Sequence, residues 1–430
     1  MDTSLLTQSK GLRHLVRRMW AISRFYGLGP ARMEQALERF IAVLETHGAR
    51  ATLPIPAVTL ARQVALVRRL QARGIELAVH GWTHVPLDSR PPDEQYAHLG
   101  RARDAFVAAG IRATGFRAPY LRRDDNLRAA AEAVGFAYVS NQPVLWDVFD
   151  AEAFSSATYA AYERAIAFYM PWRASERLSL PRLHNQLVEI PVSLPDDEML
   201  GDRLGGGNGL VERAWRHILV ETHRRGELFA IQLHPERIAG CVDGLSAILT
   251  EARTLTPPVW LARLDEIATW WRDRSGATVE ITDVGDGLFR LVVAGPSGST
   301  LLARAVAVDA PTEAWADGYR RVEALSCIVR APLRPLIGLS PATSLKLADF
   351  LRQQGYVVEI SKEGYRYPYF FDQCEFTAEC ERPLLAQIEG TDRPLVRLGR
   401  WPNGARSALA ITGDIDALTL WDYGLRFLGR

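Results

Sequence analysis

The sequence has little cysteine, almost no lysine and no long hydrophobic run. Four cysteines in 430 residues are too few for a disulfide framework, and their spacings miss the C-x2-C pattern of zinc ribbons. No run of about 18 apolar residues occurs, so we predict no membrane span. The first 20 residues lack the apolar segment and cleavage site of a signal peptide, which favours a cytoplasmic protein.

Neither sign of charge is in excess. Lys and Arg total 51, against 50 for Asp and Glu, so the formal net charge is +1. This balance argues against a nucleic-acid partner and against a solvated acidic tail. The basic residues are nearly all arginine, which we attribute to genome composition. With 48% hydrophobic residues the chain can build large cores, and its length suggests two or three domains.

Short apolar runs alternate with amphipathic stretches between residues 34 and 261. We predict strands at 51–55, 75–79, 113–118, 136–140, 187–192 and 228–233. We predict helices at 34–44, 63–73, 93–109, 126–134, 210–225, 242–253 and 260–272, and an irregular, aromatic segment at 145–185. Such alternation is typical of a parallel β/α architecture, either an open sheet or a closed barrel.

The pattern changes after residue 276. Strands at 279–281, 289–293 and 301–306 are separated by glycine-rich turns, which indicates antiparallel hairpins. A helix at 344–354 and a strand at 356–360 follow. We therefore predict an accessory module at 276–395. Residues 407–416 look once more like a barrel strand, so residues 396–430 are expected to return to the first domain.

Polar residues with useful chemistry follow several predicted strands. His80 and His84 stand four apart directly after a strand, so one tight turn could direct both imidazoles at a cation, although two surface histidines would have the same spacing. Arg117 could fix a carboxylate, and the Pro119–Tyr120 turn could present a backbone N–H; a strand end with a surface arginine is the plain alternative.

Two further strand ends carry titratable groups. His234 precedes a proline turn and is a candidate acid or base, although His-Pro-Glu also suits the start of a helix. Asp414 and Asp416 could divide the work, one binding metal and one acting as base, or could simply mark an Asp-rich strand exit. In a β/α barrel all these residues would share the face on which active sites are built.

Together these motifs resemble the polysaccharide deacetylase family, the NodB-homology or carbohydrate esterase family 4 group. Its order is an aspartate pair, H-x3-H, R-x-P-Y and a late histidine. Here His80/His84, the 117–120 segment and His234 follow that order, whereas the only aspartate before residue 51 is Asp2. The D-x-D motif stands instead at Asp414 and Asp416. We interpret this displacement as a circular permutation, or as a strand that completes a neighbouring subunit's barrel.

The resemblance implies a fold class: α/β, a distorted (β/α)7 barrel of NodB type. Residues 1–275 would give six strands and residues 396–430 the first strand, with a smaller β-rich α+β module at 276–395.

It also implies roles. Asp416, His80 and His84 would hold one divalent metal, most plausibly zinc. Asp414 would be the base, His234 the acid and Arg117 the partner of Asp414. Substrate and oxyanion contacts would come from four further residues: Pro119, Tyr120, Trp82 and Trp146.

The implied function is a metal-dependent hydrolase that removes an N-acetyl or similar acyl group from a sugar or glycoconjugate, and a homo-oligomer is compatible with it. One alternative keeps the fold but cleaves a small-molecule or cyclic amide. The other is a non-catalytic glycan-binding or scaffold protein, with aromatic residues between Tyr365 and Phe371 as a stacking platform. Such a protein would be expected to have lost some of the metal or acid/base residues.

Overall fold

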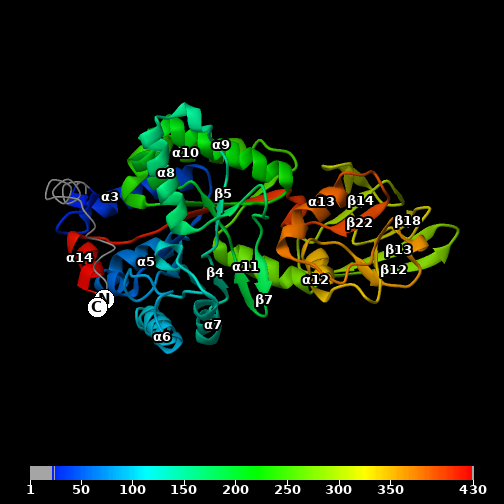
Figure 1. The fold of residues 1–430 in the computed structure, drawn as a ribbon, viewed down its shortest axis with the longest axis horizontal. Coiled ribbons are helices and arrows are strands. Elements are labelled where there is room, and N and C mark those ends of the chain that lie inside the picture. Colours follow the sequence, from blue (N-terminus) through cyan, green and yellow to red (C-terminus); the bar gives the residue numbers. More distant parts are fainter. Residues whose placement is uncertain (1–21, 24, 429–430) are drawn as a thin grey trace.

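The computed structural model describes residues 22–23 and 25–428, and shows a barrel with helices around it at one end and a β-rich module at the other (Figure 1). The strands of the largest sheet are β1 (Ala51–Ile55), β2 (Glu76–Val79), β3 (Gly115–Phe116), β4 (Tyr138–Val139), β5 (Pro143–Leu145), β6 (Trp172–Arg173), β7 (Arg182–His184), β8 (Leu187–Glu189), β9 (Val192–Leu194), β10 (Leu228–Leu233), β11 (Val259–Leu261) and β23 (Ser407–Gly413). Its helices are α3 (Ala31–Thr46), α4 (Ala57–Arg62), α5 (Val64–Ala72), α6 (Pro92–Ala108), α7 (Asp125–Val134), α8 (Ser156–Tyr169), α9 (Asn208–Arg225), α10 (Val242–Ala252), α11 (Leu264–Ser275) and α14 (Leu420–Leu428).

Two broken strands let the sheet curl into a barrel. β4 pairs with β8, and the continuations of these strands, β5 and β9, pair with each other; β9 then pairs with β10. All these pairings are parallel, and they join the β4 edge of the sheet to its β10 edge. The ring therefore has seven positions, as predicted: β1, β2, β3, β4/β5, β8/β9, β10 and β23.

The seventh strand comes from the C-terminus. β23 lies between β10 and β1, pairs in parallel with both, and is buried along all seven residues. In the structure of the single chain it completes the ring. A strand with two hydrogen-bonded neighbours and two covered faces reads as a continuous apolar run, which is what Ala408–Ile411 provides. Permutation stays a hypothesis about how this strand order arose.

Two predictions in the barrel region were wrong. Residues 260 and 261, expected to begin a helix, instead belong to β11, which pairs with the first half of β23. β1 reaches only Ile411 and Thr412 of β23, so β11 covers the edge that β1 leaves open. The segment 145–185, expected to be irregular, contains α8. Only Tyr162 of this helix is buried, so no apolar period marks it in the sequence.

The module consists of three small sheets. Its strands are β12 (Thr278–Gly285), β13 (Leu288–Ala294), β14 (Leu301–Arg304), β15 (Ala307–Val308), β16 (Thr312–Ala314), β17 (Tyr319–Val322), β18 (Ser326–Arg330), β19 (Ile337–Leu339), β20 (Val358–Ile360), β21 (Tyr369–Phe371) and β22 (Leu395–Leu398), with helices α12 (Leu345–Gln353) and α13 (Glu381–Glu389). Two sheets are antiparallel and the third, β20-β19-β21, is parallel. β22, which starts at the predicted boundary, pairs with β14 of the module.

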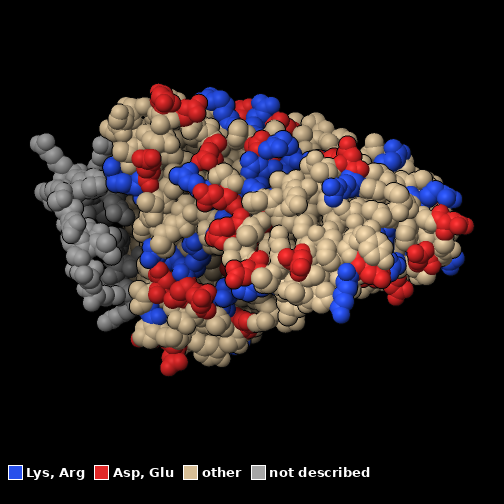
Figure 2. All heavy atoms as spheres, turned by 45° about the vertical axis from the view of Figure 1, so that its right-hand side comes forward, with Lys and Arg blue, Asp and Glu red and all other residues tan. Residues whose placement is uncertain are grey.

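The surface carries both signs of charge. On the face drawn in Figure 2, acidic and basic side chains are interspersed over the barrel and the module, as the near-balance of charge predicts. Within the described part of the chain, no helix has the length and apolarity needed to cross a bilayer.

The break between β4 and β5 depends on a buried carboxyl group. Three residues separate Val139 from Pro143, but only two separate their partners Glu189 and Val192, so the β4/β5 strand bulges. One oxygen of Glu189 accepts the backbone N–H groups of Asn141 and Gln142 at 2.9 and 3.2 Å, which satisfies donors that the bulge takes out of the ladder. Burial raises the pKa of Glu189 to about 7.

This raised pKa predicts a pH-dependent stability. Because folded Glu189 keeps its proton up to a higher pH than the unfolded chain does, its contribution is complete below pH 4.5 and is lost as the pH rises to about 7. We expect Glu189→Gln, which keeps the accepting oxygen, to reduce the loss of unfolding free energy between pH 5 and 8 by on the order of 2 kcal/mol. Urea unfolding at several pH values measures this. If the unfolding free energy of the variant depended on pH as that of the wild type does, the result would contradict this expectation.

Candidate active site

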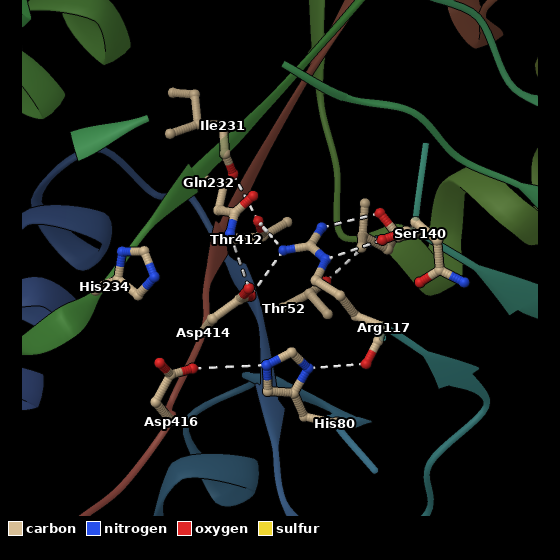
Figure 3. Close-up of polar contacts among 12 residues, drawn as sticks. Thr52, His80, Arg117, Ser140, Ile231, Gln232, His234, Thr412, Asp414 and Asp416 are labelled. Atoms are coloured by element: carbon tan, nitrogen blue, oxygen red, sulfur yellow. Dashed lines mark hydrogen bonds and ion pairs between the residues drawn. The ribbon is translucent and has the colours of Figure 1, made fainter. Parts of the chain in front are cut away.

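The structure brings the six predicted metal and acid/base residues together. His80 follows β2, Arg117 follows β3, His234 follows β10, and Asp414 and Asp416 follow β23. His84 lies one turn beyond His80. Because parallel strands of a barrel end on the same face, residues separated by more than 300 positions in sequence meet there (Figure 3).

The two histidines and Asp416 form a group of donors suited to a metal. Oδ1 of Asp416 lies 3.5 Å from His80 Nε2 and 3.1 Å from His84 Nε2, and the three ligand atoms lie within 4.8 Å of one another. A tetrahedral ion with bonds of about 2.0–2.1 Å has ligand atoms about 3.3 Å apart, so the two distances from Asp416 are close to those of a zinc site. Both imidazoles are buried, whereas Asp416 is partly open to solvent. That opening leaves a side on which water and substrate could approach.

Hydrogen bonds to neighbouring groups fix the orientation of the His80 ring and the turn after it. Nδ1 of His80 donates to the Arg117 carbonyl at 2.8 Å, which leaves Nε2 as the lone-pair nitrogen facing Asp416 (Figure 3). Gly81 follows with φ +80°, in the region that favours glycine. The backbone N–H of Trp82 donates to His98 at 2.7 Å. Burial, with Arg90 and Arg101 nearby, lowers the pKa of His98 to about 4 and keeps it a neutral acceptor.

Asp414 is held from both sides. Its Oδ1 accepts from Arg117 at 2.8 Å, and its Oδ2 accepts from the Gln232 amide at 3.0 Å. The Arg117 guanidinium also donates to the Thr412 hydroxyl and to the carbonyl and hydroxyl oxygens of Ser140. Arg117 and Asp414 are almost entirely buried, so each is the counter-charge that offsets part of the other's desolvation cost inside the barrel. The arrangement gives the Asp414 carboxylate one orientation.

His234 has a partner that the sequence did not identify, Asp197. The His234 Nδ1 lies 2.8 Å from one oxygen of Asp197, and the His234 backbone N–H donates to the other at 2.9 Å. Burial alone would lower the pKa of His234, but the charge and hydrogen bond of Asp197 outweigh it and hold that pKa well above its usual value. In Figure 3 the ring lies on the side of Asp414 away from Arg117. A protonated imidazole here can donate to a leaving group.

Asp196 and Asp197 with His234 form a second group of possible metal donors. Since Asp197 already engages His234 through both oxygens, we assign this group to proton transfer rather than metal binding. Burial and the charge of Asp197 raise the pKa of Asp196 to about 7. The adjacent aspartates at the end of β9 are the signal that could have revealed Asp197, since the same reasoning found Asp414 and Asp416.

The four predicted substrate contacts are placed differently from one another. Tyr120 has a left-handed backbone, φ 59°, and its ring meets the His84 ring edge-on at 4.5 Å, directly after the buried Pro119. Trp82 lies between the two histidines in the sequence, and the Arg101 guanidinium lies over its ring, 3.7 Å from the centroid. Trp146 is buried at the end of β5, in the wall of a separate cavity.

Comparison with known proteins supports the resemblance. Residues 26–139 match the family model described as polysaccharide deacetylase, and this segment carries His80, His84, Arg117 and Tyr120. The match confirms the predicted family resemblance, and the strand topology shows the predicted barrel with additional β-rich sheets. It does not include His234 or the two aspartates of β23. No curated protein matches the chain.

Solved structures show more distant similarity. A candidate polysaccharide deacetylase from Mycobacterium smegmatis is 22% identical with a TM-score of 0.41, and the match covers 54% of this chain and 76% of that one. Puue allantoinase is 18% identical with a TM-score of 0.42, over 55% and 72%. A CE4 family pseudoenzyme from Bacillus anthracis is 15% identical with a TM-score of 0.33, over 54% and 60%.

Proposed function

Starting from a barrel whose residues 26–139 match the polysaccharide deacetylase family, we propose that this protein is a metal-dependent hydrolase that removes an N-acetyl or similar acyl group from a sugar or glycoconjugate. One observation carries the proposal. The His80/His84/Asp416 group lies beside a buried carboxylate on one side and a protonated imidazole on the other. Hydrolysis of an amide needs these three functions in one place.

His80, His84 and Asp416 would hold the cation, which when bound supplies an acidified water and polarises the acyl carbonyl. Asp414 takes a proton from the attacking water, whose oxygen bonds to the carbonyl carbon. The backbone N–H of Tyr120 donates to the oxygen that gains charge. As the C–N bond breaks, His234 gives its proton to the departing amine. Arg117 aligns Asp414 through its hydrogen bond, and Asp197 favours the protonated form of His234 by raising its pKa.

A purely glycan-binding role is less well supported. Such a protein has no use for a buried Arg117–Asp414 pair or for a histidine kept protonated, since both cost desolvation energy. Among the tyrosines proposed as a stacking platform, Tyr367 and Tyr369 are buried in the module and only Tyr365 is well exposed. The aromatic rings of this segment therefore belong mainly to the core of the module.

Amine release from N-acetylated sugars and from small N-acyl amides, measured on the zinc-loaded protein, tests the proposal. We expect release that a chelator abolishes and added zinc restores. Release from small amides alone would move the activity to the alternative substrate class. Absence of release from either class by zinc-loaded protein would contradict the hydrolase.

A further inference from the structure

A cavity of about 360 Å³ lies between the end of β5 and α8 and has no assigned occupant. Tyr159, Tyr162, Glu163 and Ile166 line it from one face of α8, as their i, i+3, i+4, i+7 spacing requires. Trp146 and Phe149 close it from the segment after β5, and Arg173 lies at its rim. Its volume is within the range of small-molecule sites.

Protein cations cover Trp146 of the lining and the neighbouring Trp172, but not the other aromatic rings of the cavity. Arg225 lies over the Trp146 ring at 5.1 Å, and Arg177 and Arg182 lie over Trp172 at 5.6 and 5.3 Å. Among the described residues, no guanidinium lies over the other three rings of the lining: Phe149, Tyr159 and Tyr162. The Tyr159 and Tyr162 rings are tilted at 50° with centroids 5.7 Å apart, so they form a corner.

Among the charged groups that line the cavity, one carboxylate has no ion-pair partner within the described residues. Asp147 and Arg173 pair with each other at 3.0 Å. Glu163 forms no ion pair within the described part of the chain, and it stands one helical turn from Tyr159 on the same face. The lining of aromatic rings therefore carries a net negative charge.

We propose that this cavity binds an organic ammonium group. Aromatic faces attract a cation through their quadrupole, and a nearby carboxylate neutralises its charge; ring cages of this kind bind quaternary ammonium ligands. A sugar ring could also stack there, but the unpaired Glu163 and the absence of a guanidinium over these rings favour a cation.

The position of the cavity links it to the reaction, an extension that rests on the proposed function. The last turn of α8 carries Phe168, whose ring lies 6.0 Å from that of Tyr120, which in turn contacts His84. The last turn of the helix that lines the cavity therefore lies near the metal ligands, although Phe168 itself stands on the side of α8 opposite Tyr159. We infer that the substrate is an N-acyl compound with a second, protonated amine.

Choline and its uncharged isostere 3,3-dimethylbutan-1-ol separate charge from shape, and calorimetric titration of the full chain measures both. We expect choline to bind at least about fivefold more tightly than the isostere, because only choline gains the cation–π and carboxylate contacts. Tyr159→Leu and Glu163→Gln should each weaken choline binding about two- to fivefold. Tyr96→Leu, at an exposed ring on α6, is the matched control and should change nothing.

Equal affinity for choline and its isostere, or binding of N-acetylglucosamine but not choline, would overturn the cation assignment. Asp416→Ala should bind choline as the wild type does, so this result does not depend on turnover. Choline should also raise KM for an N-acetyl diamine without changing kcat. If choline binds selectively but leaves KM unchanged, the cavity is a separate ammonium site and the inferred link to substrate is wrong.

Discussion

Asp414→Asn should lower kcat at least about 10²-fold while the protein retains its metal, because positioned general bases contribute about 10²–10⁴-fold. The asparagine oxygen can still accept from Arg117, so the local structure keeps one of its two contacts. What is lost is the capacity to take a proton from water. Steady-state kinetics and metal content, measured on the same preparation, check both halves of this expectation.

Asp104→Asn, at an exposed position on α6, is the control for the chemical change itself and should be indistinguishable from wild type. Removing a charge opposite the buried Arg117 could also lower stability, so thermal unfolding should accompany the kinetics. A folded Asp414→Asn protein with full activity would contradict the base assignment. Loss of metal with retention of the fold would show that Asp414, rather than Asp416, is the ligand.

His234→Gln should lower kcat about 10²–10⁴-fold on an N-acyl substrate, whose amine leaves poorly without a proton. The same variant should lose much less activity on an activated aryl ester, since a phenolate with a low pKa leaves unprotonated. A comparison of the two substrates isolates the acid step from binding and from metal. Equal losses on both would contradict an acid role and point to a structural one.

The pairing with Asp197 adds a pH dependence to this prediction. Since the acid must be protonated, activity should fall as the pH rises through the pKa of His234, which Asp197 holds above its usual range. Asp197→Asn removes the charge that raises this pKa, so the alkaline limb of kcat/KM should move to lower pH. A limb that stays in place would mean that His234 is not the titrating acid.

Residues that lie at the end of a long apolar run could be predicted from the sequence. His234 and Asp414 follow β10 and β23, whose buried strands are six and seven residues long, so their place at one face of a barrel follows from the run alone. The return of the last strand could also be predicted, because the six apolar runs in the front part are one fewer than the seven strands that the family resemblance implies.

The partners of these residues could not be predicted, because they depend on register across the barrel. Ser140 and Thr412 reach Arg117 only because β3 and β23 approach the same interior from different sides. Gln232 was passed over as an ordinary strand residue, although it is two residues from His234 and donates to Asp414. Serine, threonine and glutamine carry no spacing signal, so only the folded arrangement shows which of them face the site.

Helix α8 was missed for a different reason. α8 has one buried residue, and its other aromatic residues are only partly buried or exposed, so its sequence lacks the apolar stripe of a packed helix. β11 has only three residues, too few for a period to be read. Both elements depend on tertiary contacts to form.

Elemental analysis of the purified protein tests the central claim most directly, with wild type beside His80→Ala and Asp416→Ala. The account predicts about one zinc or similar ion per chain in the wild type and its loss in both variants, because ligands from β2 and β23 share one ion. Metal lost only in His80→Ala would remove Asp416 from the site. No metal in the wild type, even after zinc is supplied, would contradict the metal-dependent hydrolase.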